Sequence, residues 1–281
     1  MHIITDSAAD FTREELIKYH VACVHMQVIF GEESTSAADL SSEIFWQRLL
    51  AGEIAKTSQP APDAFLTQFE DVSDADEEII YIGVSSAISG TVQSATIAAS
   101  MLENEKIHIV DTLSGASGQK LLVLHACRLR DEGQLSAKEI AEELNKLRSR
   151  IHLYASLDTL ENLARSGRIS KAAASIGTLA QLKPRVKITP DTDGHVEVCG
   201  KAIGRHRAID ALIKLIGKQS IDERFPIIPI YSYNQDNCDA LIKKLKTGSM
   251  AVNEDLCSAL GPTLATHIGP NAYGLAFVAA E

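Results

Sequence analysis

The clearest sign of the fold lies at residues 79–91, whose sequence is Ile79-Ile80-Tyr81-Ile82-Gly83-Val84-Ser85-Ser86-Ala87-Ile88-Ser89-Gly90-Thr91. Its first six residues form an apolar run of strand length, and the small and polar residues after them are typical of a loop. A helical pattern follows over residues 91–102. A strand that ends in a small-polar loop and enters a helix is one repeating step of an α/β fold.

The same alternation extends through the N-terminal half of the chain. Apolar runs predict two more strands at residues 3–5 and 107–110. Helical patterns are predicted at residues 13–20, 42–50, 62–71, 91–102 and 118–132. Strands that alternate with helices predict a largely parallel sheet, whose ligands bind at the carboxyl ends of the strands. The loops that follow the strands are therefore the candidates for a site.

A second pattern begins near residue 136, where Ser136 and Glu139 have the spacing of a capping box at the start of a helix over 136–149. Asp193-Gly194 supplies a tight turn between strands at 186–189 and 195–198. The other predicted strands are 151–156, 227–233, 249–252 and 273–279, and the other predicted helices are 158–163, 171–182, 205–218 and 236–246. We place a domain boundary near residue 150, which divides the chain into residues 1–150 and 151–281.

Composition limits the classes of function. The 281 residues are 45% hydrophobic, enough for a sizeable core, and 27 Lys and Arg against 37 Asp and Glu give a net charge of −10. This charge disfavours nucleic acid and anionic membrane surfaces as partners. The five cysteines do not have the spacing of a metal-binding motif, and we expect them to be reduced, mostly buried thiols. The chain shows no leader pattern and no apolar run of membrane-spanning length, which predicts a cytoplasmic protein without stable membrane insertion.

Several common catalytic and cofactor motifs are missing. There is no GxGxxG fingerprint, no GxSxG elbow and no HExxH pair. The loop between Gly83 and Gly90 resembles a phosphate loop superficially, but it is six residues long and no Lys precedes Thr91. The sequence therefore predicts no cofactor and no metal site.

Three small-polar loops remain as candidates, and each has an ordinary structural explanation. Residues 56–63 lead into a helix that Pro62 can open, and Ser89-Gly90-Thr91 stands at a helix start, where a Ser is most simply an N-cap. Residues 266–272 place His267 on a tight turn before the last strand, and a lone His is usually structural. Spacing alone does not show that the three loops meet.

Their order and residue types nevertheless resemble the DegV family of bacterial fatty-acid-binding proteins, which serve as the lipid-carrying subunit of fatty acid kinase. Six motifs in the family's order, spread over nearly the whole chain, carry the resemblance: Ile4-Thr5-Asp6-Ser7-Ala8-Ala9-Asp10, Thr57-Ser58-Gln59-Pro60, Ser85-Ser86-Ala87-Ile88-Ser89-Gly90-Thr91, Asp111-Thr112-Leu113-Ser114-Gly115-Ala116, Ser166-Gly167-Arg168-Ile169-Ser170-Lys171 and Thr266-His267-Ile268-Gly269-Pro270. Together they are far more specific than any one of them.

The resemblance implies an N-terminal α/β/α domain with a parallel sheet and a C-terminal α/β domain with a mixed sheet. One long-chain fatty acid, such as palmitate, would lie between them, and a partner fatty acid kinase would convert it to an acyl phosphate for phospholipid metabolism. The protein itself would have no catalytic residue.

The family's site residues carry over to matching positions of this chain. The carboxylate ligands implied are Thr57, Ser89 and His267, the supporting loop residues are Ser58, Gly90, Thr91 and Thr266, and the residues implied for kinase docking are Arg168 and Arg205. Two positions depart from the family pattern. Asn271 stands where a Gly is usual, which puts the turn after His267 in doubt, and Ile203 stands where an Arg is expected, which puts part of the docking surface in doubt.

Elementary chemistry agrees with such a site. Two hydroxyls, an imidazole and a helix N-terminus can hold a buried carboxylate. About 0.8 kcal/mol per buried methylene gives on the order of 11 kcal/mol for an acyl tail, before entropy costs. We expect the tunnel wall to include residues 95–99 and 172–182, for which plain core is the alternative. Residues 165–207 carry nine Lys and Arg against three acids, a candidate docking face.

Two other functions remain open. Ser89 as nucleophile and His267 as base would make an acyl hydrolase, although no elbow and no orienting acid are recognisable. A small-carbonyl-binding subunit resembling those of dihydroxyacetone kinase, in which a His engages the substrate, is the second alternative.

Overall fold

The computed structural model describes residues 1–72, 77–169, 181–248 and 250–281. Its first sheet consists of four parallel strands in the order β2 (Val21–Val24), β1 (His2–Asp6), β6 (Ile79–Gly83) and β7 (Ile107–Asp111). The three strands predicted at 3–5, 79–84 and 107–110 are confirmed. The strand β2 lies in a stretch for which the sequence pattern predicted none.

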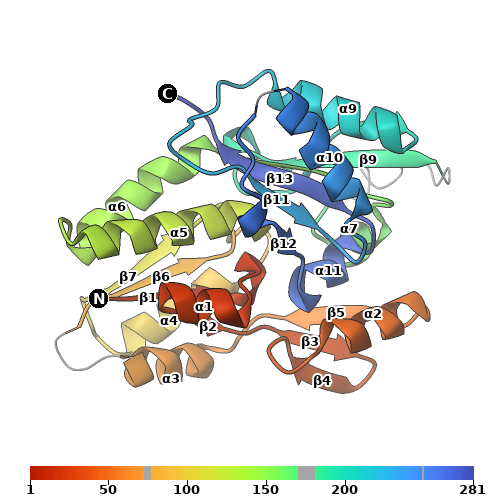
Figure 1. Cartoon of the computed structure of the whole chain (residues 1–281). Coiled ribbons are helices and arrows are strands. Elements are labelled where there is room, and N and C mark those ends of the chain that lie inside the picture. Colours follow the sequence, from red (N-terminus) through yellow and green to blue (C-terminus); the bar gives the residue numbers. More distant parts are fainter. Residues whose placement is uncertain (73–76, 170–180, 249) are drawn as a thin grey trace.

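Helices cover both faces of this parallel sheet. The helices α3 (Pro62–Val72) and α4 (Thr91–Met101) lie on one face, and α5 (Ala116–Glu132) and α6 (Ala137–Leu147) lie on the other, as Figure 1 shows. The capping box at Ser136 is present at the start of α6. The short helix α1 (Arg13–Tyr19) leads into the edge strand β2.

The second sheet is mixed, in the order β10 (Glu197–Ile203), β9 (Leu182–Ile188), β8 (Ile151–Ser156), β13 (Tyr273–Val278), β11 (Ile228–Tyr231) and β12 (Ser258–Ala259). Only β11 and β12 pair in parallel. The predicted hairpin is confirmed as β9 and β10, although both strands are longer than expected.

Three elements predicted in this half differ from the described structure or lie largely outside it. The strand predicted at 249–252 is wrong within the described residues, because only Val252 pairs, in an isolated bridge with Ile227. The helix predicted over 171–182 lies outside the described residues except at its end, where Leu182 begins β9. The helix predicted at 158–163 is found slightly later, as α7 (Glu161–Arg165).

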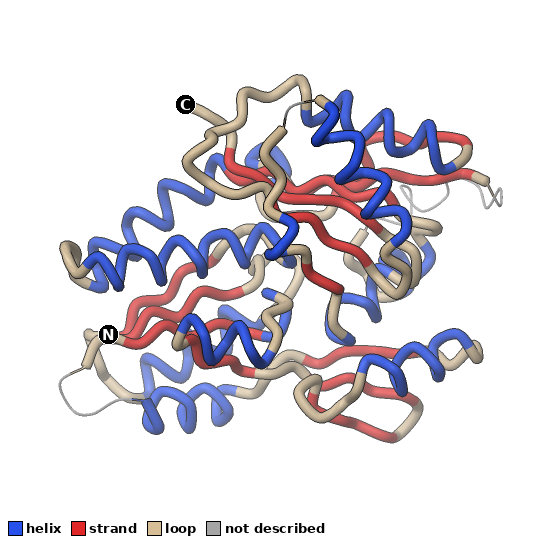
Figure 2. The backbone as a smooth tube through the Cα atoms, in the orientation of Figure 1, coloured by secondary structure: helices blue, strands red, loops and turns tan. Residues whose placement is uncertain are grey.

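The two larger sheets and their helices form successive layers. The helices α9 (Arg205–Ile216) and α10 (Asp236–Thr247) cover the outer face of the mixed sheet, and α5 lies between the two sheets (Figure 2). Leu121 and Leu122 of α5 share one core with Ile82 of the parallel sheet and Ile230 of the mixed sheet. A continuous core therefore crosses residue 150, and the division of the chain there remains a proposal.

A small antiparallel sheet, absent from the sequence prediction, extends from the N-terminal half. Its order is β4 (Glu33–Ser36), β3 (Gln27–Phe30) and β5 (Ala55–Ser58), and α2 (Ser42–Leu50) packs on it through Phe45. The helix α11 (Pro262–Ile268) contacts β3 and β5. This contact brings the C-terminal part of the chain against the N-terminal part.

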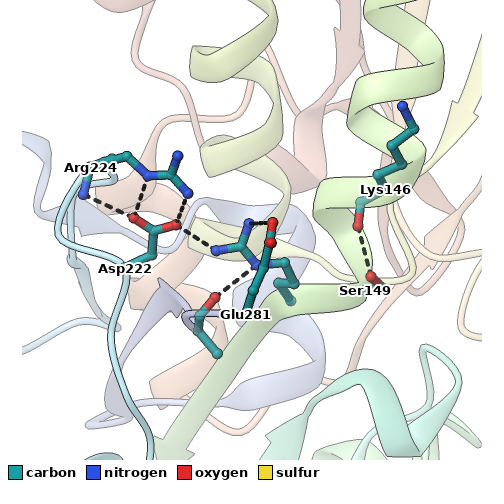
Figure 3. A network of polar contacts seen from close by, with 7 residues as sticks. Lys146, Ser149, Asp222, Arg224 and Glu281 are labelled. Carbon is teal, nitrogen blue, oxygen red and sulfur yellow. Dashed lines mark hydrogen bonds and ion pairs between the residues drawn. The ribbon is translucent and has the colours of Figure 1, made fainter.

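A polar network fixes the start of the mixed sheet (Figure 3). Arg150 donates from Nη2 to Asp222 Oδ2 over 2.5 Å and from Nε to the carbonyl of Ala279 over 2.8 Å. Arg224 donates to the same carboxylate, and the two guanidinium groups hold the pKa of Asp222 well below its usual range. Arg150 thereby ties the residue before β8 to the residue after β13.

No helix among the described residues has both the length and the apolar character needed to cross a membrane.

Candidate functional site

An apolar pocket lies where the inner face of the mixed sheet meets the loops after the parallel strands. It contains about 890 Å³ of space free of protein atoms, including its open mouth. Val84 and Ala116 line it from the N-terminal half, and Leu153, Val186 and Ile230 line it from the C-terminal half. The loops at the carboxyl ends of β6 and β7 therefore contribute to the pocket, as expected for an α/β sheet.

Thr57 and His267 meet at this pocket. Thr57 lies on β5, where it pairs with Val28 of β3, and its side chain is half-buried because alternate residues of a strand face opposite ways. The distance from Thr57 Oγ1 to His267 Nε2 is 2.8 Å, a hydrogen bond whose donor depends on the imidazole tautomer. The loop expected at 56–63 is thus partly a strand, although α3 does begin at Pro62 as predicted.

His267 lies in the last turn of α11, so its expected place on a tight turn is wrong. The helix begins after Gly261 with Pro262 at its first position, and Gly269 is its C-cap. Its seven residues are too few to show a clear helical period in the sequence. Burial, with Arg168 as a smaller contribution, lowers the pKa of His267 to about 4. The imidazole is therefore neutral near pH 7.

Ser89 lines the same pocket but does not cap the following helix. The N-cap of α4 is Gly90, which makes no side-chain capping bond, and the Ser89 hydroxyl lies 2.7 Å from the hydroxyl of Thr91. The structural explanation of Ser89 as an N-cap is therefore wrong. Gly90 leaves room for the side chain of Gln59, because a Cβ there would lie only 2.1 Å from Gln59 Oε1. Gln59 in turn donates to Ser94 Oγ over 3.1 Å, so the loop after β5 packs on the start of α4.

The other supporting residues have different surroundings. Ser58 is exposed, on the opposite side of β5 from Thr57. Thr91 is fully buried beneath Ser89, and the Thr266 hydroxyl donates to the carbonyl of Pro262 within α11 over 2.8 Å. Thus Thr57, Ser89 and His267 line one pocket, whereas Ser58 does not face it.

Arg168 lies at the mouth of the pocket, a position that the sequence did not indicate. Its guanidinium donates from Nε to the carbonyl of Ile88 over 3.1 Å and from Nη1 to that of Ser166 over 2.5 Å, and it is half-buried. Arg168, Thr57 and His267 also line a second, more polar pocket. Lys56 and Arg165 line this outer pocket too, which adds positive charge beyond the hydroxyl and imidazole groups.

The other residues singled out from the sequence, Arg205, Ile203 and Asn271, do not line the apolar pocket. Arg205 is exposed at the start of α9 and donates to the carbonyl of Asp236 over 2.5 Å. Ile203 is 54% exposed at the end of β10. Asn271 has a φ of 59°, in the left-handed region that Gly and Asn favour, so the substitution keeps the turn after Gly269. The Asn271 amide also donates to Asp158 Oδ2 over 2.9 Å.

The expected tunnel wall at residues 95–99 is wrong. Ala95 and Ala98 are buried against Phe65 and Tyr81, on the α3 and α4 side of the parallel sheet, and do not line the pocket. The expectation for residues 172–180 falls outside the described residues. Short apolar side chains cannot show from sequence alone which face of a sheet they cover.

The arrangement differs from a nucleophile–base pair. His267 Nε2 is bonded to Thr57, whereas the Ser89 hydroxyl is bonded to Thr91. Among the described residues, no group of three or more His, Cys, Asp and Glu is placed to hold a metal ion. The thiols are all free, but only Cys127 and Cys238 are fully buried, so the expectation of mostly buried thiols is only partly correct.

Comparisons with known proteins place this geometry in a family. The family model described as "Uncharacterised protein, DegV family" matches residues 1–280. The DegV domain-containing protein YteA of Lactococcus lactis is 35% identical over 274 residues, which cover 95% of this chain and 93% of that protein.

Solved structures agree. A DegV family protein from Thermus thermophilus, described as binding fatty acid, is 28% identical with a TM-score of 0.87 and covers 99% of both chains. DegV of Bacillus subtilis, described as a fatty acid binding protein, is 25% identical with a TM-score of 0.82 and covers 99% of both chains. The chain belongs to the DegV family.

Proposed function

We propose that this protein binds one long-chain fatty acid and presents its carboxylate to a partner fatty acid kinase, which forms the acyl phosphate. The observation that carries the proposal is the apolar pocket that ends at Thr57, Ser89 and His267. A hydrocarbon tail gains free energy from such a pocket, and a carboxylate needs donors where it leaves water. The fatty acids bound by the relatives from Thermus thermophilus and Bacillus subtilis support the same ligand class.

The Thr57–His267 pair suits a carboxylate when the imidazole proton is on Nε2. His267 then donates to Thr57 Oγ1, and the hydroxyl proton of Thr57 is free for the ligand. Ser89 supplies a second hydroxyl at the same pocket. Neutral hydroxyls hold the acid less tightly than a direct ion pair would, and Arg168, which lines the same pocket, supplies positive charge at its mouth. The carboxylate oxygen thus stays available for reaction.

The outer pocket supports delivery to a second protein. It shares Thr57, Arg168 and His267 with the apolar pocket and is open to solvent, so a partner that holds ATP can approach the carboxylate there. Arg168 and the exposed Arg205 are the residues we assign to kinase docking. The half-buried position of Arg168 indicates that its contact with a partner would be made at the pocket mouth.

One experiment tests the ligand. Mass spectrometry of the organic acid that accompanies the protein after mild purification should show a freely extractable long-chain fatty acid. A small carbonyl compound would favour the dihydroxyacetone-kinase-like alternative. Incubation with an activated acyl ester tests the acyl hydrolase alternative, because a covalent acyl adduct on Ser89 would indicate a hydrolase and contradict the proposal.

A second experiment tests the partner. Arg168→Glu should retain the fatty acid but lose phosphorylation by the kinase. Arg13→Glu is the matched control, because Arg13 is an exposed cation on α1 that lines neither pocket. Unchanged turnover of Arg168→Glu would remove the proposed role of this residue.

A further inference from the structure

Two cysteines lie in contact beside the segment that leads to the site. Cys238 is in the first turn of α10, and Cys257 precedes β12. Their Sγ atoms are 3.9 Å apart, and both thiols are free. The two residues come from separate elements, 19 positions apart in the chain. A covalent link between them would therefore join two parts of the fold.

The two thiols differ in accessibility. Cys238 is fully buried in the core between α9, α10 and the mixed sheet. Cys257 is only partly buried, at the edge of the same core. Cys257 is therefore more open to a small oxidant than Cys238, whose sulfur lies against that of Cys257. This is the arrangement of a reacting cysteine beside a resolving cysteine.

Electrostatics favours Cys257 as the reacting thiol. Burial raises the pKa of Cys23, Cys127 and Cys199. The pKa of Cys257 is lowered, chiefly by the hydrogen bond from the Cys238 thiol, while burial and the Asp239 charge oppose this shift and the Lys120 charge adds to it slightly. Lys120 Nζ donates to the hydroxyl of Ser258, the residue next to Cys257, over 2.7 Å. A thiolate is the form that reacts with peroxides.

We propose that Cys257 and Cys238 form a peroxide-reactive dithiol, in which oxidation links α10 to the segment that leads into α11. The Cys257 thiolate attacks one oxygen of hydrogen peroxide and breaks the O–O bond, giving a sulfenic acid and hydroxide. The Cys238 sulfur then attacks the Cys257 sulfur, the S–O bond breaks, and water leaves with the Cys238 proton. The two cysteines lose two electrons, and the peroxide gains them.

The geometry allows this link with a local adjustment. The sulfurs, now 3.9 Å apart, must approach by about 2 Å to reach the length of a disulfide bond. The link would fix Cys257 relative to α10. Three residues later, Leu260 lines the apolar pocket, and the next residue, Gly261, is the N-cap of the helix that carries His267. The disulfide would thus restrain the chain segment that precedes α11, from a position outside the pocket.

The test uses the full-length protein with hydrogen peroxide, followed by thiol counting and peptide mass spectrometry. We expect loss of two of the five thiols, a mass lower by two hydrogens, and a linked pair of peptides that contain Cys238 and Cys257, all within a monomer. Cys238→Ser should stop at a sulfenic acid on Cys257, which a cyclic diketone traps. Cys127→Ser, which removes a thiol buried in α5, is the matched control and should form the disulfide normally.

Three results would overturn the proposal. They are loss of all five thiols at equal rates, a disulfide between a different pair of cysteines, and no oxidation of Cys257 at peroxide concentrations that oxidise the unfolded chain. None of these results depends on a bound lipid, so they leave the proposed function of the pocket intact.

Discussion

The Thr57 hydroxyl and the His267 imidazole lie 2.8 Å apart although 210 positions separate them in the chain. Thr57 reaches this position on an edge strand of the small antiparallel sheet, and His267 reaches it on α11, which packs against that strand. The contact therefore depends on a sheet and a helix that the hydrophobic pattern did not reveal. Both residues line the apolar pocket and the outer pocket, so they mark where the two meet.

Thr57→Val should weaken retention of the fatty acid by about 10- to 100-fold, or roughly 1–3 kcal/mol, because it removes a hydroxyl donor and keeps the side-chain shape. Ser58→Ala is the control, since Ser58 is exposed on the other side of the same strand. Displacement of a fluorescent fatty acid measures both variants. Equal affinities for Thr57→Val and the wild type would remove Thr57 from the carboxylate site.

Gly90→Ala should disturb the pocket through Gln59. The φ of Gly90 is −78°, which any residue adopts, and the nearest obstacle to a methyl group is the Gln59 amide. We expect a loss of stability of about 1–3 kcal/mol and weaker lipid retention. Gln59→Ala combined with Gly90→Ala removes the clash, and thermal unfolding of both proteins measures the recovery. Failure of the double variant to recover any stability would show that the clash is not the cause.

His267 should make stability depend on pH between about 4 and 6.5. Burial lowers its pKa to about 4, from an ordinary value of 6.5, so over this window the unfolded chain binds a proton that the folded protein does not. The free energy of unfolding therefore rises with pH across the window, and the contribution of His267 to it is fully present above pH 6.5. His267→Gln should show a shallower rise in urea titrations at pH 4.5, 5.5 and 7. Because His125 has a similarly low pKa, the comparison uses the difference between the two proteins. Parallel curves would contradict the assignment.

The sequence was informative where elements are long or strongly apolar. β1, β6 and β7 were predicted because short, mostly apolar runs are typical of strands in a parallel sheet. β5 was not, because Ala55, Lys56, Thr57 and Ser58 alternate between half-buried and exposed positions and carry no large apolar side chain. The helix α11 has only seven residues, too few to show a helical period.

The site was predicted by motif resemblance rather than by pattern. The six motifs pointed to Thr57, Ser89 and His267, and the structure brings these residues to one pocket. The motifs did not show that Arg168 lies at the pocket mouth, since its position depends on a bond to the carbonyl of Ile88, 80 residues away. The pocket wall was not predicted at residues 95–99, because α4 and the mixed sheet both carry buried apolar residues and the sequence does not show which of them face the pocket.

Asp10→Asn should stabilise the protein increasingly as pH rises from about 4 to 8. Asp10 is buried, and its Oδ1 accepts a hydrogen bond of 2.9 Å from the backbone N–H of Gly261, at the start of α11. Burial raises the pKa of Asp10 to about 8, from an ordinary value of 3.8. The folded protein therefore keeps a proton that the unfolded chain releases, and this carboxyl lowers the free energy of unfolding as pH rises through the window.

The Asn variant separates this titration from the contact that Asp10 makes. An amide oxygen can still accept from Gly261, and Asn tolerates the φ of 51° found at this position, but the side chain no longer ionises. Urea unfolding of both proteins at pH 5, 6.5 and 8 should show a gap in favour of the variant that widens with pH. Asp10→Ala, which removes the acceptor as well, should be less stable than the wild type at pH 5, where the wild-type carboxyl is protonated and still accepts from Gly261. If the gap between Asp10→Asn and the wild type stays constant from pH 5 to 8, the carboxyl does not titrate in this range and its role is limited to holding the first turn of α11.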